Sequence, residues 1–372
     1  MTFWFPAALH PTPATYEGEF DDPPVFHYRV KLPGQGLNAM THAEWSSPVI
    51  VGENIYVGSA GARALFALSR RDGHKVKTYP ADGTVEGEAL VTDAHVYFGD
   101  TGGTTYCYTL DGTLVWRFDS SGPVLAAPTL TPDGSRVLVT TVDDLVMAFD
   151  AATGALAWQY RSKRDLTREA ELTLYDTPPP VIAGDLVLLG FSSGTLTALD
   201  LATGEEQWKR AIGEGRYPDI VAAPVVVGTD AYVSGYFKPL VAVDLPSHNV
   251  RWRVDVGAAG AVLPITEGDR QVLIHPGSDG KLRAIVALTG AELWTWDSGT
   301  SGSLTEPVET PAGLVVASTE GVIQLVDAEK GELVWRWDER YELEGISSRP
   351  AVNGRQLVFV SNAGYLYSML SP

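Results

Sequence analysis

The sequence predicts an all-β fold, an eight-bladed β-propeller of four-stranded antiparallel blades. Two repeated phrases carry this prediction. One phrase usually contains tryptophan and recurs at intervals of about 40 to 50 residues, and a second phrase occurs eight times. The composition agrees, because 38 glycines and 24 prolines in 372 residues suit many short strands joined by tight turns.

The first phrase is a turn followed by a strand with tryptophan near its start. Its seven copies are DGHKVK, DGTLVW, TGALAW, TGEEQW, SHNVRW, TGAELW and KGELVW. Tryptophan occupies the same place in six of them, and Lys77 occupies it in the first copy: Trp116, Trp158, Trp208, Trp252, Trp294 and Trp335. Glycine in the turn permits a positive φ, and an indole can fill the gap between blades. We therefore expect these tryptophans to be packing residues.

The second phrase begins each repeat with small residues and usually proline, followed by a strand, a turn and another strand. Eight beginnings against seven endings leave the last blade, from about Ser347 to Leu370, one strand short. We expect residues 25–32, VFHYRVKL, to supply that strand with Tyr28 near the tryptophan position, because closure removes unpaired strand edges. The predicted organisation is a Pro-rich N-terminal extension over residues 1–24 and a single propeller over residues 25–372.

Charge and cysteine content exclude several classes of function. The formal net charge of −19 disfavours binding to nucleic acid or to anionic lipid. Cys107 is the single cysteine, and the seven histidines do not fall at metal-ligand spacing, so we expect no disulfide and no metal. Residues 1–9 lack a basic segment, and no stretch of about 18 apolar residues occurs. We expect no secretory signal within this sequence and membrane contact only through a partner or an absent lipid anchor.

Two local motifs suggest catalysis and are better explained by turns. GFSSG at residues 190–194 matches the nucleophile-elbow pattern around Ser192, but strands flank it where that motif needs a strand and a helix. We interpret it as a hairpin turn. Asp143 and Asp144 are adjacent carboxylates, which we interpret as a solvated charge pair in another turn.

The repeat phrase, apolar-Asp-x-x-Thr-Gly-x-x-x-Trp, resembles the repeat of the quinoprotein propellers over nearly the whole chain from Val25 onward. One branch of that superfamily comprises dehydrogenases that hold a quinone cofactor beneath a vicinal cysteine pair. One cysteine cannot form that pair, so we expect no cofactor and no catalytic residues. The other branch is the BamB family of periplasmic lipoproteins in outer-membrane β-barrel assembly, which the sequence resembles more closely in length and in its N-terminal closure.

The resemblance to BamB also implies a partner-binding site. Residues 171–210 resemble the BamB region whose Leu-x-Leu-Arg stretch docks onto a POTRA domain of the insertase BamA; Leu172 and Leu174 match the leucines, and Tyr175 stands at the arginine position. In the next blade Asp219 matches the first of two acidic contacts, whereas Val221 replaces the second. The alternating pattern around Leu172 and Leu174, rimmed by Tyr175 and Tyr217, is typical of anchor residues. The alternative is that both leucines are core residues of blade 4.

These observations lead to three functional hypotheses. The first is a monomeric, non-enzymatic scaffold that docks to a POTRA-containing barrel-assembly protein in the periplasm, at the outer membrane. The second is a quinone-binding enzyme or sensor that uses the central channel. The third is a protein-interaction propeller that serves another complex.

Overall fold

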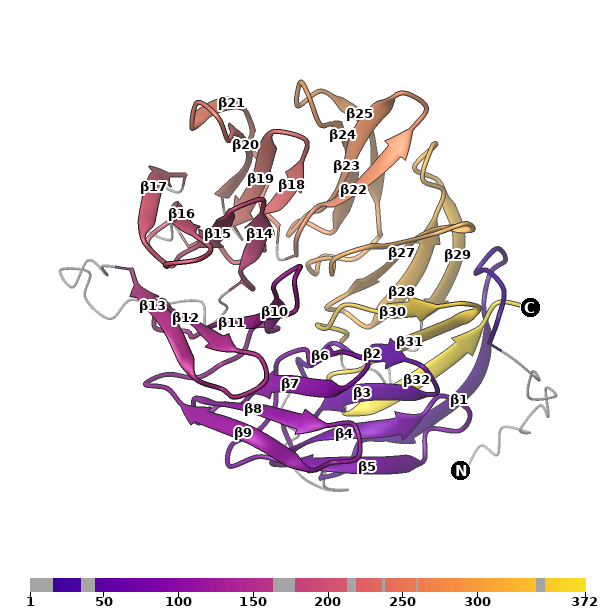
Figure 1. Ribbon diagram of the computed structural model, residues 1–372. Helices are drawn as coiled ribbons and strands as arrows, with labels where there is room; N and C mark the ends of the chain where they lie inside the picture. Colours follow the sequence, from indigo (N-terminus) through magenta and orange to yellow (C-terminus); the bar gives the residue numbers. More distant parts are fainter. Residues whose placement is uncertain are drawn as a thin grey trace.

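The computed structural model describes residues 16–34, 44–162, 178–212, 219–235, 238–258, 260–338 and 345–372. Within these ranges the regular structure consists of strands, which form eight four-stranded antiparallel sheets arranged around a central axis (Figure 1). The predicted eight-bladed propeller is confirmed. No helix of the described residues is long and apolar enough to cross a membrane.

Each blade runs from an innermost strand to an outermost strand in chain order, except blade 8. Blades 1 to 4 comprise β2 (Val49–Val51), β3 (Asn54–Gly58), β4 (Ala64–Ser69), β5 (Lys75–Pro80); β6 (Leu90–Val91), β7 (His95–Gly99), β8 (Thr104–Thr109), β9 (Leu114–Asp119); β10 (Thr129–Leu130), β11 (Arg136–Thr140), β12 (Leu145–Asp150), β13 (Leu156–Arg161); and β14 (Val181–Ala183), β15 (Leu186–Gly190), β16 (Thr195–Asp200), β17 (Glu206–Ala211).

The second half of the ring repeats this order. Blades 5 to 8 comprise β18 (Val225–Val227), β19 (Asp230–Gly235), β20 (Lys238–Asp244), β21 (Asn249–Val254); β22 (Leu263–Glu267), β23 (Arg270–Pro276), β24 (Lys281–Val286), β25 (Glu292–Asp297); β26 (Val308–Thr310), β27 (Gly313–Ser318), β28 (Val322–Val326), β29 (Leu333–Asp338); and β30 (Ala351–Asn353), β31 (Gln356–Val360), β32 (Tyr365–Leu370), β1 (Val25–Lys31). The core lies between blades, where the second and third strands bury apolar side chains in eight clusters.

The N-terminal strand closes the ring as predicted. Strand β1 pairs antiparallel with β32 along its whole length and forms the outer edge of blade 8 (Figure 1). Tyr28 pairs with Ser368 just after a bulge, and Trp158 pairs with Ala148 beside the corresponding bulge in blade 3. Tyr28 therefore stands in the tryptophan position of the last blade. The division into an extension over residues 1–24 and a propeller over residues 25–372 stays a prediction.

Several of these tryptophans bond to the next blade through the indole N–H. Trp158 Nε1 donates a hydrogen bond of 3.1 Å to the backbone oxygen of Leu201, in the turn between the third and fourth strands of blade 4. Trp116, Trp252 and Trp294 make the same bond at 3.0, 2.9 and 3.1 Å. Gly204 in the receiving turn has a φ of 74°, and a Cβ there would lie 2.5 Å from the Trp158 ring. The predicted packing role of these indoles is confirmed.

Candidate docking surface

The candidate site lies on one face of the propeller, which we call the docking face. It is formed by the connections between successive blades and by the turns between the second and third strands of each blade. Antiparallel strands bring these two kinds of segment to the same end of a blade. In blades 3 and 4 the turns are residues 141–144 and 191–194, and the connections are residues 162–180 and 212–224.

Most of the predicted contact residues lie outside the described residues. Leu172, Leu174 and Tyr175 belong to residues 163–177, and Tyr217 belongs to residues 213–218. Asp219 is described; it directly precedes the buried Ile220 and is 6% exposed. The assignment of these five residues to partner binding therefore stays a prediction, while the segments that flank them can be placed.

Both ends of the first connection are held by blade 3. At its start, the backbone N–H of Ser162 donates to the backbone oxygen of Asp144 at 3.0 Å. At its end, the hydroxyls of Thr140 and Thr129 donate to the backbone oxygens of Pro178 and Pro180 at 3.2 and 2.8 Å. The residues on either side of Leu172 and Leu174 are thus fixed relative to blade 3.

The second connection is held at both ends by the turn of blade 4. The N–H of Ile212 donates to the oxygen of Gly194 at 2.8 Å, and the N–H of Ile220 donates to the oxygen of Phe191 at 3.3 Å. Ile220 is also 2% exposed and packs in the core between blades 4 and 5. The residues on either side of Tyr217 therefore depend on the position of residues 191–194.

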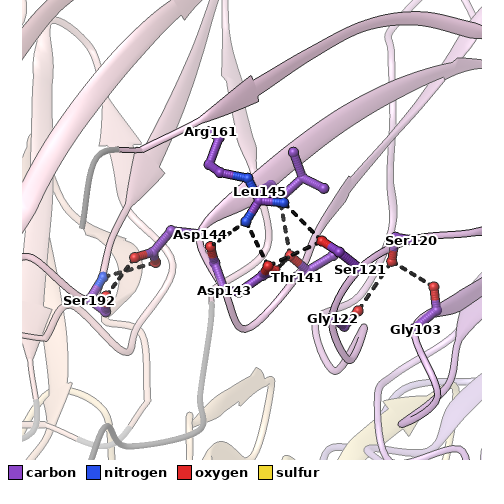
Figure 2. Close-up of polar contacts among 10 residues, drawn as sticks. All are labelled: Gly103, Ser120, Ser121, Gly122, Thr141, Asp143, Asp144, Leu145, Arg161 and Ser192. Atoms are coloured by element: carbon purple, nitrogen blue, oxygen red, sulfur yellow. Dashed lines mark hydrogen bonds and ion pairs between the residues drawn. The ribbon is translucent and has the colours of Figure 1, made fainter. Parts of the chain in front are cut away.

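A side-chain contact links the turn of blade 3, residues 141–144, to the turn of blade 4, residues 191–194 (Figure 2). The Ser192 hydroxyl donates to Oδ2 of Asp144 at 2.5 Å, and the Ser192 backbone N–H donates to Oδ1 at 3.2 Å. Hydrogen bonds to a carboxylate are stronger than those between neutral groups. Asp144 therefore connects the turn that holds the start of the first connection with the turn that holds the second.

This contact corrects one sequence interpretation and confirms another. Asp144 is 2% exposed, so the expectation of a solvated pair with Asp143 is wrong for Asp144. Ser192 lies between β15 and β16, which confirms the hairpin turn in place of a nucleophile elbow. A signal for the Asp144 contact existed, because aspartate stands where other repeats have glycine.

An accessible ion pair extends the network toward blade 2. Arg161 Nη1 lies 2.6 Å from Oδ2 of Asp143, and Arg161 Nη2 donates to the Ser121 hydroxyl at 2.8 Å (Figure 2). Burial favours protonation of Asp143, but hydrogen bonds from Thr141 and Arg161 outweigh it and hold the pKa of Asp143 below its ordinary value. The side chain of Arg161 is 48% exposed, so this part of the docking face offers both signs of charge to a partner.

A separate charged group lies on the same face, beside the innermost strands of blades 2, 7 and 8; we call this position the channel mouth. It joins three residues that each lie two positions before an innermost strand: Glu88, Glu306 and Arg349. Arg349 Nη2 donates to both carboxylate oxygens of Glu88 at 3.0 Å, and Nη1 donates to Glu306 at 3.2 Å. A cofactor that bears carboxylates needs cationic side chains that are free to bind them. The Arg349 guanidinium is already paired with two carboxylates, so this group of residues does not fit such a cofactor. Among the described residues, no group of three His, Cys, Asp or Glu side chains could hold a metal ion.

The fold and this face define the class of protein: a β-propeller of PQQ-like repeats whose candidate site is built from loops at one end of the blades. Comparison with known families is more specific. The model of the family described as outer membrane protein assembly factor BamB matches residues 80–275 and 278–370, and the chain belongs to this family. The resemblance found in the repeats is thereby confirmed.

Individual relatives agree with this assignment. The outer membrane protein assembly factor BamB of Yersinia pestis is 26% identical over 299 residues, which cover 76% of this chain and 71% of that protein. The corresponding protein of Burkholderia pseudomallei is 26% identical over 329 residues, covering 86% and 83%.

Two solved structures show the same fold. BamB from Moraxella catarrhalis superposes with a TM-score of 0.76 at 18% identity, covering 94% of this chain and all of that one. A quinohemoprotein alcohol dehydrogenase from Pseudomonas putida superposes with a TM-score of 0.72 at 12% identity, covering 93% of this chain and 76% of that one. At such low sequence identities, these two superpositions show that the fold is shared and do not show a shared function.

Proposed function

We propose that this protein is a monomeric, non-enzymatic scaffold of outer-membrane β-barrel assembly, which acts in the periplasm and docks to a POTRA domain of the BamA insertase. The contact would be made by the docking face of blades 3 and 4, with Leu172 and Leu174 as apolar anchors. Tyr175 and Tyr217 would form the rim around them, and Asp219, which is 6% exposed, would lie beneath that rim. Membership of the assembly-factor family supports the role, and the relatives are named as assembly factors of outer membrane proteins.

The observation that carries the proposal is the common frame of the two connections. A rigid frame lowers the entropy that loops lose when they bind, which favours affinity. Blade 3 holds both ends of the first connection, blade 4 holds both ends of the second, and Asp144 bonds to Ser192 between them. Such a frame suits a surface that must present the side chains of two separate segments together.

The enzymatic alternative receives no support from the channel mouth. Arg349 donates to Glu88 and Glu306, so the guanidinium that could bind an anionic quinone already has two carboxylate partners. Adding a quinone together with calcium and following the melting temperature checks this alternative. A clear stabilisation by the quinone would revive it.

A binding experiment tests the docking proposal. The purified chain is captured by an immobilised POTRA region of BamA from the same organism, and the variant Leu172→Asp/Leu174→Asp is compared with it. We expect the variant to be captured far less, because charged side chains cannot occupy an apolar pocket without a large desolvation penalty. Leu288→Asp is the matched control, since Leu288 is 69% exposed in a turn of blade 6 on the opposite face.

The outcomes separate the hypotheses. Equal capture of the wild type and the double variant would move the contact away from Leu172 and Leu174. A folded wild type that the POTRA region does not capture at all would defeat the proposed partner. That result would favour a propeller that serves another complex.

A further inference from the structure

Asp144 occupies a position that glycine occupies in the other regular turns of the docking face. This is the residue immediately before the third strand of a blade. Five other blades have glycine there with positive φ: Gly103 (91°), Gly194 (75°), Gly280 (74°), Gly321 (84°) and Gly364 (79°). Asp144 has a φ of 59°.

The turn itself does not require aspartate. The N–H of Asp144 donates to the oxygen three residues earlier at 3.1 Å, and the N–H of Gly103 makes the same bond at 3.1 Å. A side chain with a Cβ is disfavoured in the left-handed region, where glycine is at ease. A residue other than glycine that keeps this backbone conformation often has a side chain with a specific function.

The side chain of Asp144 reaches from blade 3 to blade 4. Its two carboxylate oxygens accept the hydroxyl and the backbone N–H of Ser192. Ser192 lies between Phe191 and Gly194, whose backbone oxygens hold the two ends of the connection that contains Tyr217. The backbone oxygen of Asp144 holds Ser162, at the start of the connection that contains Leu172 and Leu174.

We propose that Asp144 is the positioning residue of the docking surface: it fixes the described ends of the two connections, at Ser162 and at Ile212 and Ile220, relative to each other. This inference rests on the proposed function, because the connections matter only if a partner contacts them. Asp144 itself, at 2% exposure, is not placed to touch the partner. It acts through Ser192 and Ser162.

A second residue provides a matched control. Among the described residues, His248 is the other non-glycine with positive φ, at 60°. It lies in the turn between β20 and β21 on the opposite face, where Gly204 and Gly290 stand in other blades, and its ring stacks on Trp208 with centroids 4.6 Å apart. His248→Gly also restores glycine at a positive φ, but far from the proposed contact.

The test compares affinity for the POTRA region with fold stability. We expect Asp144→Gly to melt within a few degrees of the wild type, because the turn regains the residue that suits it, and to bind about tenfold more weakly. Asp144→Asn keeps an oxygen that can accept from Ser192 and should retain most of the affinity. Ser192→Ala removes the hydroxyl contact from the other side and should weaken binding several-fold, whereas His248→Gly should not change it.

The results distinguish this inference from the proposed function. If the wild type binds the POTRA region and both Asp144→Gly and Ser192→Ala bind equally well, Asp144 has no positioning role, although the docking proposal stands. If the wild type does not bind, both fail. Should Asp144→Gly fail to fold, Ser192→Ala and Asp144→Asn decide the question alone. Faster hydrogen exchange at Ile212 and Ile220, whose N–H groups donate to the turn that contains Ser192, is the expected accompanying change in the folded Asp144→Gly variant.

Discussion

Arg349 of blade 8 donates from Nη2 to both carboxylate oxygens of Glu88 in blade 2, across 261 residues of sequence. Nη1 of Arg349 donates to Glu306 of blade 7. The backbone N–H of Arg349 donates to the hydroxyl of Ser47 in blade 1 at 3.1 Å. One residue thus connects the last blades with the first ones at the channel mouth. The ring depends on this contact in addition to the pairing of β1 with β32.

Removing the Arg349 guanidinium should destabilise the closed ring. Burial already raises the pKa of Glu306, and Arg349→Met would leave Glu306 beside Glu88 without the cation that favours its charged form. Because the Arg349 side chain is 40% exposed, we expect a loss of about 2 kcal/mol rather than the full cost of breaking a buried pair. Chemical denaturation at neutral pH measures it.

Arg117→Met is the control for this experiment. Arg117 is 39% exposed and pairs with Asp82 and Asp119, which are themselves mostly exposed. Its replacement should cost much less than that of Arg349, because exposed ion pairs contribute little to stability. Equal losses for the two variants would show that the Arg349 contact does not help to close the ring.

Gly204 should be far less replaceable than a glycine of similar conformation elsewhere. Gly204→Ala places a Cβ 2.5 Å from the Trp158 ring, so the contact between blades 3 and 4 must shift. We expect a cost of about 3 kcal/mol or more, from overpacking added to the unfavourable φ. Gly184→Ala, at a φ of 61° with nothing within 4 Å, should cost about 1 to 2 kcal/mol. Similar unfolding free energies for the two variants would contradict the role of Trp158 in filling the gap between blades 3 and 4.

Phe20 should anchor the segment that precedes the closing strand. It is 1% exposed and packs in the core between blades 7 and 8, so Phe20→Ala should lower the unfolding free energy by about 3 kcal/mol or more. Phe26→Ala, at 45% exposure within β1, should cost less than about 1 kcal/mol. Thermal and chemical unfolding of both variants check this, and a Phe20→Ala protein as stable as the wild type would rule out the anchor.

Stability should fall in mild acid because of His275. Its ring is fully buried between blades, and burial and the nearby Arg283 lower its pKa to about 4 from the ordinary 6.5. The unfolded chain therefore binds a proton more readily than the folded chain between these values. His275 therefore leaves the unfolding free energy unchanged above about pH 6.5. As the pH falls toward 4 it lowers the unfolding free energy, by about 2 kcal/mol at pH 5 and about 3 kcal/mol below pH 4.

His275→Leu isolates this effect, because Leu189 occupies the equivalent strand position in blade 4. Unfolding free energies measured between pH 7.5 and 4.5 should decline less steeply for the variant than for the wild type. Parallel pH profiles would mean that His275 does not remain neutral in the folded chain.

The repeats predicted the architecture because each one encodes the same local and neighbouring contacts. The tryptophan phrase marked the outermost strands, and the shortage of one strand at the C-terminus pointed to β1, with Tyr28 in the tryptophan place. Its hydroxyl donates to the oxygen of Arg70 at 3.0 Å, as Trp158 donates to Leu201 in the next blade. A periodic pattern reveals contacts that recur.

Contacts that occur once were beyond such reasoning. Asp144 and Ser192 lie 48 residues apart in two different turns, and the sequence of neither turn indicates which residue the other one contacts. Arg349 finds Glu88 only because eight blades bring distant residues to one ring. The departure from glycine at position 144 was visible in the sequence, but its meaning depended on knowing which turns face each other.

We propose above that the docking face of blades 3 and 4 binds a POTRA domain through Leu172 and Leu174. The most direct measurement is the dissociation constant of the POTRA region of BamA for the folded chain, by calorimetric titration, for the wild type, Leu172→Asp/Leu174→Asp and Leu288→Asp. We predict measurable binding for the wild type and Leu288→Asp, and an affinity at least about tenfold weaker for the double variant. Equal dissociation constants for all three proteins would contradict the claim.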